Sequence, residues 1–204
     1  MKRYAKQIGP KADVTHLDEL DLRDLKEACI HGKASAGGLD GFAPADFRLL
    51  SDEAFRMLAN LLVMIEDGAP WPTPTNEGRS AFMSKDIQTL NDVLAYRLPS
   101  ILSVLYRRWA TVRLRNLKRW IATWAEEGFF AGIDAVCAED AWWETAIVIE
   151  DIRLNDTPFS AGTADIFKCF DQIPREFIYM LALHLGMDPK MLFTYRRFQE
   201  QMQM

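Results

Sequence analysis

The longest helical pattern in the chain lies between residues 99 and 124, and it constrains the fold more than any other feature. Large apolar side chains recur there at helical spacing: Ile101, Leu105, Trp109, Val112, Trp120 and Trp124. Pro99 suits the first turn of a helix, where a missing N–H leaves no bond unmade. The pattern predicts one long helix over 99–124, with an apolar side around which a domain can form.

Shorter patterns surround this helix. Thr15 is a candidate cap for a helix that ends near residue 28, and Ser51 for one that reaches residue 65. Asp188 followed by Pro189 predicts the start of a helix over 189–201. Further predictions are helices from residue 44, over 138–152 and over 175–185, strands over 79–84 and 158–167, and loops over 32–41 and 67–78.

Composition limits the class of protein. The 204 residues are 49% hydrophobic and 26% charged, which is typical of a soluble globular domain with a sizeable core. Three distant cysteines exclude a disulfide framework or a zinc site by spacing and fit a reducing, intracellular setting, in the cytoplasm or the nucleus. We expect no signal peptide, transmembrane segment or membrane partner. The pattern leaves two architectures open: a helical bundle, or an α+β domain whose sheet is only partly present.

Charge is distributed unevenly. The net charge of −5 would by itself argue against a nucleic-acid partner, yet residues 93–125 contain no acidic side chain. Seven cations occur there: Arg97, Arg107, Arg108, Arg113, Arg115, Lys118 and Arg119. A basic helix with interleaved tryptophans predicts contact with a nucleic-acid backbone. The competing interpretation places the tryptophans in the core and the arginines on an ordinary solvated face.

An acidic residue marks the end of the second predicted strand. Asp165 stands near the end of the strand, within 162–174 (GTADIFKCFDQIP). Nucleotidyl transfer needs carboxylates at a sheet edge to hold Mg²⁺ against a triphosphate, and Asp165 could supply one of them. A strand-end acid followed by aromatic residues is more often a helix cap or a surface residue, and Asp171 fits the start of the next helix better than a metal site.

The order of several motifs resembles the reverse transcriptases of LINE-type, non-LTR retrotransposons and the related group II intron enzymes. The similarity covers about residue 33 onward. A Gly-x-Asp-Gly loop stands at 38–41 (GLDG), a strand with a terminal lysine at 81–85 (AFMSK), and a Tyr-Arg stretch at 96–103 (YRLPSILS), where Pro99 replaces an aliphatic residue. The acidic palm strand of the family corresponds to the segment around Asp165.

The resemblance implies a fold and an activity. The expected fold is α+β, with mostly helical fingers and an incomplete antiparallel palm sheet of the right-hand polymerase type. Residues 1–32 would form a helical lead-in, 33–157 the fingers, and 158–204 the truncated start of the palm. The implied activity is RNA-directed DNA synthesis from deoxynucleotides with Mg²⁺, on an RNA template and a DNA primer.

The same resemblance assigns roles to residues. Lys85 and Arg97 would grip the triphosphate, and Asp165 would be the catalytic metal ligand. Phe170, five positions after Asp165, would exclude a ribose 2′-hydroxyl and so select deoxynucleotides. Arg107, Arg108, Arg113, Arg115, Lys118 and Arg119 would contact nucleic acid.

Two departures from the family pattern restrict these expectations. Residues 128–134 (GFFAGID) lack the Gln and Arg of the family's template loop, and no Tyr/Phe-x-Asp-Asp hairpin follows Asp165. One carboxylate cannot position two Mg²⁺ ions, so we expect no polymerisation by this chain without the remainder of the polymerase polypeptide. The alternative from another class is a non-catalytic helical remnant that binds nucleic acid or a protein partner.

Overall fold

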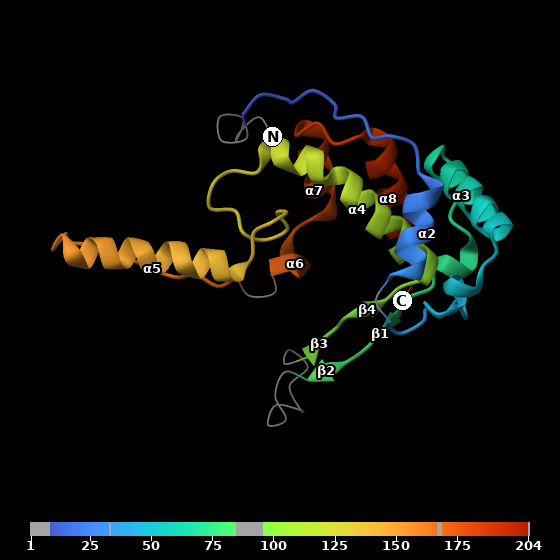
Figure 1. Ribbon diagram of the computed structural model, residues 1–204, viewed down its shortest axis with the longest axis horizontal. Helices are drawn as coiled ribbons and strands as arrows, with labels where there is room; N and C mark the ends of the chain where they lie inside the picture. The colour runs from blue at the N-terminus through green and yellow to red at the C-terminus, as the bar shows by residue number, and fades with distance from the viewer. Residues whose placement is uncertain (1–8, 33, 85–95, 167–168, 204) are drawn as a thin grey trace. The chain divides into compact units, whose positions relative to one another are not determined.

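A computed structural model describes residues 9–32, 34–84, 96–166 and 169–203 of the chain. These residues form two compact units. The larger unit comprises His16–Asn116 and Asp188–Met204, and the smaller unit comprises Met1–Thr15 and Leu117–Met187. Helices dominate, accompanied by two short pairs of antiparallel strands (Figure 1). The expected α+β class is compatible with this content, whereas the right-hand polymerase fold and the ranges of its regions stay predictions.

The larger unit contains four helices among its described residues. They are α2 (Leu22–Ile30), α3 (Asp52–Glu66), α8 (Pro189–Gln201) and most of α4 (Val104–Trp124), with 3-10 turns η2 (Asp46–Leu49) and η3 (Thr73–Asn76). The caps predicted for α3 and α8 are confirmed. Ser51 Oγ accepts a hydrogen bond from Ala54 N at 3.2 Å, and Asp188 Oδ1 accepts one from Lys190 N at 2.8 Å.

The prediction of a helix from Thr15 is wrong at its start. Helix α2 begins seven residues later, with Asp21 as its N-cap. The backbone before α2 makes a hydrogen bond outside the helix, because Leu17 N donates to Asp188 Oδ2 at 2.9 Å. A local pattern could not reveal this contact, since its partners lie 171 positions apart.

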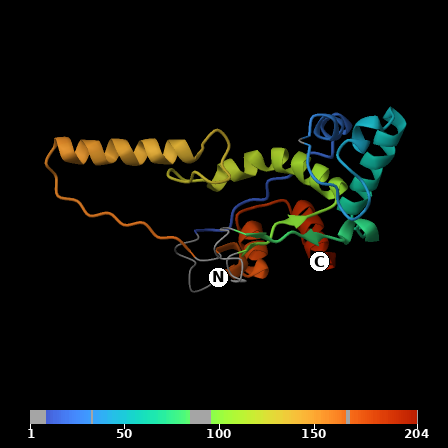
Figure 2. The same ribbon diagram turned by 90° about the horizontal axis from the view of Figure 1, so that it is seen from below.

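The four strands form an antiparallel ribbon in the larger unit, which both views show (Figures 1 and 2). Strand β1 (Arg79–Ser80) pairs with β4 (Ser100–Ile101), and β2 (Met83–Ser84) pairs with β3 (Tyr96–Arg97). Between the two pairs, Ala81 N donates to Pro99 O at 3.0 Å. The strand predicted over 79–84 is therefore present as two short pieces.

Helix α4 begins at Val104, so the predicted start at Pro99 is wrong. Proline fits a first helical turn, but it fits an edge strand as well, because only its carbonyl is available for pairing. Here that carbonyl accepts from Ala81 of the facing strand. Residues 96–101 are therefore extended because they pair with residues 79–84, and the helix begins only after this paired segment.

Aromatic side chains from three segments make the core of the larger unit. Phe198 of α8 lies face to face with Tyr106 of α4, with ring centroids 3.5 Å apart and planes 9° from parallel. Trp71 packs edge-on against Phe198 and Trp109 at 5.4 and 5.3 Å, and its Nε1 donates to Thr194 O at 3.2 Å. The interpretation of Trp109 as a core residue is confirmed, since it is fully buried.

The smaller unit contains helix α7 (Arg175–His184) and the last turns of α4. The segment before residue 16 crosses the end of α7, where Ala12 N donates to His184 O at 2.9 Å and Thr15 N to Gly186 O at 2.8 Å. Gly186 has a φ of +79°, and a Cβ there would lie 2.1 Å from Asp13 O. Only glycine permits this close approach.

Two further helices of the smaller unit are α5 (Ala138–Leu154) and α6 (Cys169–Gln172). Helix α5 confirms the helix predicted over 138–152, and it has no buried residue. The strand predicted over 158–167 is wrong for its described part, since residues 158–166 are exposed and form no strand. A strand requires a neighbouring strand to pair with its backbone, and a local sequence pattern does not show whether such a partner exists.

The cysteines differ sharply in environment, which gives a first testable prediction. Cys29 of α2 is buried, and burial raises the pKa of its thiol to about 11 despite the opposing charge of Arg108. Because the thiolate is the reactive form, brief treatment with iodoacetamide at pH 8 should label exposed Cys137 and spare Cys29. Peptide mass spectrometry measures both sites, and unfolding in urea should make Cys29 reactive. Equal labelling of the folded protein at both sites would contradict this burial.

Candidate nucleotide and nucleic-acid site

The ribbon contains the two stretches to which the family resemblance assigns triphosphate binding. Its register sets Arg97 opposite Met83 and Tyr96 opposite Ser84. The rings of Tyr96 and Phe82 meet edge to face, with centroids 6.3 Å apart. Arg97 is exposed. Lys85 directly follows Ser84 in the sequence and lies outside the described residues.

The remaining predicted active-site residues belong to the smaller unit. Asp165 is exposed in the irregular segment before α6. The side chain of Phe170, within α6, lies outside the described part of the structure. Because Arg97 belongs to the larger unit and each unit is described by itself, the convergence of Asp165 and Arg97 on one cleft stays a prediction.

Arg113, one of the cations assigned to nucleic acid, is instead engaged in a buried ion pair. Its Nε and Nη2 donate to the two carboxylate oxygens of Glu66 at 2.6 and 2.5 Å. The side chains of Arg113 and Glu66 are only 4% and 2% exposed. Trp109 Nε1 adds a third donor to Glu66 at 2.8 Å, and Arg113 Nη1 donates to Asp18 O at 2.8 Å. With its charge neutralised and its donors used, Arg113 has a structural role.

Arg107 and Arg108 hold the glycine-rich loop. Arg107 donates to Ser35 Oγ at 2.8 Å and to Ala36 O at 2.6 Å. Burial and the neighbouring charge of Arg108 lower the pKa of Arg107, while the Asp40 carboxylate opposes that shift. The buried guanidinium of Arg108 lies against Gly32, where an added Cβ would meet its Nη1 at 1.8 Å. The loop conformation and these two arginines therefore depend on each other.

The exposed cations of α4 are Arg115, Lys118 and Arg119. Within the larger unit, Arg115 forms an ion pair with Glu27 at 3.1 Å, and within the smaller unit Lys118 forms one with Asp134 at 2.7 Å. Exposed pairs of this kind contribute little to stability and exchange readily with other ions. These three side chains are available to a phosphate backbone, and their contact with nucleic acid stays a prediction.

Sequence reasoning missed Glu66, the residue that neutralises the buried arginine. A signal for it existed, because Phe55, Ala59, Leu62 and Glu66 follow one another at intervals of four, three and four. That spacing places Glu66 on the buried side of α3. An acid at an apolar helix position requires a buried cation, and the acid-free stretch 93–125 was the place to look for one.

Metal-binding side chains do not cluster in the part of the chain described. No group of three or more His, Cys, Asp or Glu side chains there could hold a metal ion. Asp165 alone does not make a two-Mg²⁺ site, so no catalytic step is assigned to it.

No family model matches the chain, and no curated protein is similar enough to count as a relative. Among the helices that the structure describes, none combines the length and the apolar character needed to cross a membrane.

Proposed function

We propose that this chain is the part of an RNA-directed DNA polymerase, of the reverse transcriptase type, that binds the incoming nucleotide and the template. The observation that carries the proposal is the antiparallel pairing of 83–84 with 96–97. Two motifs separated in the sequence, each assigned to the fingers by resemblance, become neighbours at one end of a ribbon.

The chemistry at this end of the ribbon is electrostatic. The planar guanidinium of Arg97 offers a fork of donors to phosphate oxygens, and Lys85 would add a point charge. The exposed cations of α4 would bind the template backbone through a salt-dependent interaction. DNA synthesis itself, with Mg²⁺ at Asp165 and Phe170 as the sugar gate, would require acidic residues in addition to Asp165.

Replacing Arg97 by glutamine should weaken binding of deoxynucleoside triphosphates about tenfold, because a charge-assisted hydrogen bond is lost. Calorimetric titration of the purified chain with dTTP at low salt measures this change. Arg79→Gln is the matched control, since Arg79 is an exposed arginine at the opposite end of the same ribbon. We expect that control to bind dTTP as the unaltered chain does. Equal losses in both variants, or no binding of dTTP, would contradict the proposal.

A non-catalytic protein that binds nucleic acid is the second candidate, favoured by the exposed Arg115, Lys118 and Arg119. Binding measurements with dTTP and with single-stranded RNA distinguish the two candidate functions. A binding protein of this kind should take up single-stranded RNA with an affinity that falls as salt rises, and it should show no saturable binding of dTTP. The proposed polymerase part should bind both.

A further inference from the structure

Arg108 of α4 is a buried cation for which the described residues provide no counter-ion. It is only 7% exposed, and its Nε is enclosed without a hydrogen-bond partner in the described part of the chain. The two Nη atoms form no hydrogen bond with a described residue either, but they are not enclosed, so a ligand can reach them. Arg113, on the same helix, shows what such a charge requires, because both carboxylate oxygens of Glu66 accept from it. An unpaired buried charge is costly, so an anion from outside the chain would stabilise Arg108.

A pocket of about 350 Å³ opens beside this guanidinium, within the larger unit. One face of α4 and the glycine-rich loop line it, through Ser35, Arg107, Arg108, Ala110, Thr111 and Leu114. Its volume lies in the range of small-molecule sites and accommodates an oxyanion with a small organic group. Leu114 is 59% exposed, so an apolar group beside the anion would remove apolar surface from water.

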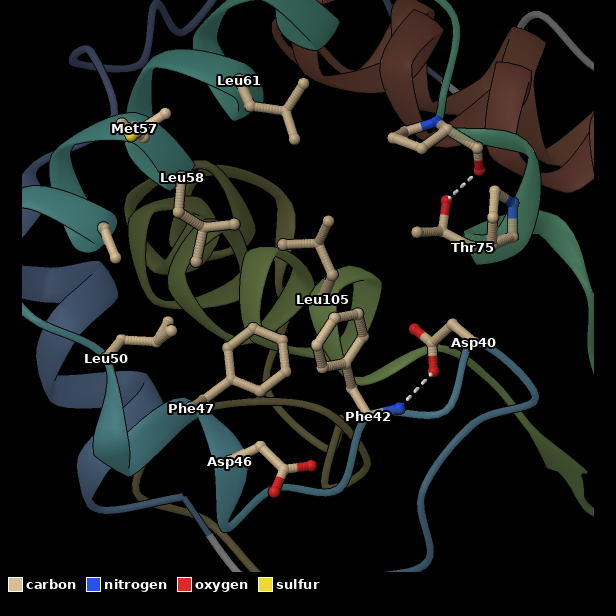
Figure 3. A pocket seen from close by; sticks show the side chains of 13 residues that line it. Asp40, Phe42, Asp46, Phe47, Leu50, Met57, Leu58, Leu61, Thr75 and Leu105 are labelled. Atoms are coloured by element: carbon tan, nitrogen blue, oxygen red, sulfur yellow. Dashed lines mark hydrogen bonds between the residues drawn. The ribbon is translucent and has the colours of Figure 1, made fainter.

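Arg107 borders the same pocket, but it has an acid nearby. Its Nη1 donates to Ser35 Oγ at 2.8 Å. The Asp40 carboxylate is its counter-charge and opposes the decrease that burial and the charge of Arg108 cause in the pKa of Arg107. Figure 3 shows Asp40 at the edge of the neighbouring apolar cavity, where its Oδ1 accepts from Phe42 N at 3.3 Å. One carboxylate beside two guanidinium groups leaves an excess of positive charge.

Two further groups near Arg108 leave its charge uncompensated. Cys29 of α2 interacts with it electrostatically, but burial raises the pKa of that thiol to about 11, so the thiol is neutral at physiological pH. Gly32, just after α2, lies against the guanidinium, and its carbonyl accepts a hydrogen bond from Arg48 Nη2 at 3.0 Å. A third guanidinium therefore adds to the positive potential of this region, which favours an anion.

We propose that this pocket binds the phosphate group of a small molecule, with Arg108 as the main contact. The Nη atoms of Arg108 donate to phosphate oxygens, a role that suits the planar fork of donors in a guanidinium. Ser35 Oγ accepts from Arg107, which leaves its hydroxyl proton for a further phosphate oxygen. Because Arg108 is recessed, a terminal phosphate reaches it better than a backbone phosphodiester, which is substituted on both sides. The site includes no residue of the ribbon, so it does not depend on the proposed function.

Calorimetric titration of the full chain with phenyl phosphate, inorganic phosphate and phenol tests the inference. Phenyl phosphate should bind saturably, and phenol at least about tenfold more weakly, because phenol lacks the charged group. The two phosphates distinguish the sources of the ligand. Tighter binding of phenyl phosphate assigns the pocket to a phosphomonoester, and equal or tighter binding of inorganic phosphate assigns it to free phosphate. No saturable binding of either phosphate, or equal binding of phenol and phenyl phosphate, would overturn the inference.

Arg108→Met separates ligand binding from a structural role. It should reduce the affinity for phosphate about tenfold or more, because the charge-assisted hydrogen bonds are lost. In phosphate-free buffer it should unfold at the same temperature as the unaltered chain or higher, because an unpaired buried charge is removed. Phenyl phosphate at about ten times its dissociation constant should raise the unfolding midpoint of the unaltered chain by about 3–6 °C, and that of the variant by much less. Unchanged phosphate affinity, or a variant that melts well below the unaltered chain in phosphate-free buffer, would overturn the inference.

Arg23→Met is the matched control, since it removes the same charge from a side chain of α2 that is 92% exposed. It should leave the affinity for phenyl phosphate unchanged. Equal losses in Arg23→Met and Arg108→Met would indicate a general effect of net charge and would overturn the assignment. Loss of binding in Arg97→Gln but not in Arg108→Met would place the phosphate at the ribbon and would overturn it as well. Failure of this inference is therefore distinguishable from failure of the proposed function.

Discussion

Replacing Glu66 by glutamine is expected to lower the free energy of unfolding of the larger unit by about 3–5 kcal/mol. The variant keeps the size of the side chain but leaves the guanidinium of Arg113 buried without its counter-charge. Arg113 is 4% exposed and cannot reach water without disturbing its contacts to Asp18 and Asn116. Urea unfolding followed by tryptophan fluorescence measures the change, because Trp109 donates to the same carboxylate.

A second ion pair on the same helix provides the control. Glu53 of α3 pairs with Arg56 at 2.8 Å, but these side chains are 71% and 59% exposed. Glu53→Gln should therefore cost only about 0.5 kcal/mol or less. A double replacement, Glu66→Leu with Arg113→Met, should recover much of the lost stability, because no buried charge remains. A loss below about 1 kcal/mol for Glu66→Gln would mean that solvent reaches the pair, against its burial here.

Local sequence signals were sufficient for several elements. The caps Ser51 and Asp188 predicted the starts of α3 and α8, because a cap and its helix are adjacent in the chain. Helical spacing over 138–152 and 175–185 found α5 and α7. Apolar periodicity also placed Trp109 in the core. These features depend on interactions between residues a few positions apart, and such local patterns can be recognised in a single sequence.

Elements decided by distant contacts were predicted poorly. The region 96–101 pairs with 79–84, and that pairing moved the start of α4 from Pro99 to Val104. Residues 158–166, predicted as part of a strand, find no ladder partner in the described structure. The contact of Leu17 with Asp188 moved the start of α2 to Leu22 in the same way. Hydrogen bonds between residues far apart in the sequence leave no local periodicity.

The candidate site was predictable in part, for the same reason. The resemblance assigned Lys85 and Arg97 to one site; the ribbon sets residues 83–84 opposite 96–97, while Lys85 lies outside the described residues and the shared site stays a prediction. Charge counting over 93–125 could not distinguish Arg113, which neutralises Glu66, from Arg119, which is exposed. The sequence shows the sign of a side chain's charge, whereas the fold decides which residue that charge pairs with.

Phe198→Ala is the second substitution with a large expected effect, a loss of about 3–5 kcal/mol in the free energy of unfolding of the larger unit. Phe198 is fully buried and contacts Tyr106 face to face and Trp71 edge to face. Truncation removes both aromatic contacts and leaves a hollow that rigid rings cannot fill by relaxing. Through these two contacts Phe198 packs α8 against α4 and Trp71 within the larger unit.

The same helix offers a matched control in Phe193, which is 46% exposed. Phe193→Ala should cost about 1 kcal/mol or less, because much of its apolar surface is already in contact with water. Urea unfolding monitored by circular dichroism compares the two variants on equal terms, since both remove a phenylalanine from α8. The difference between them isolates burial in the aromatic core from any change in helix propensity. Similar losses for both would mean that α8 is held by its helix propensity and surface contacts, and that the stacked ring of Phe198 adds little.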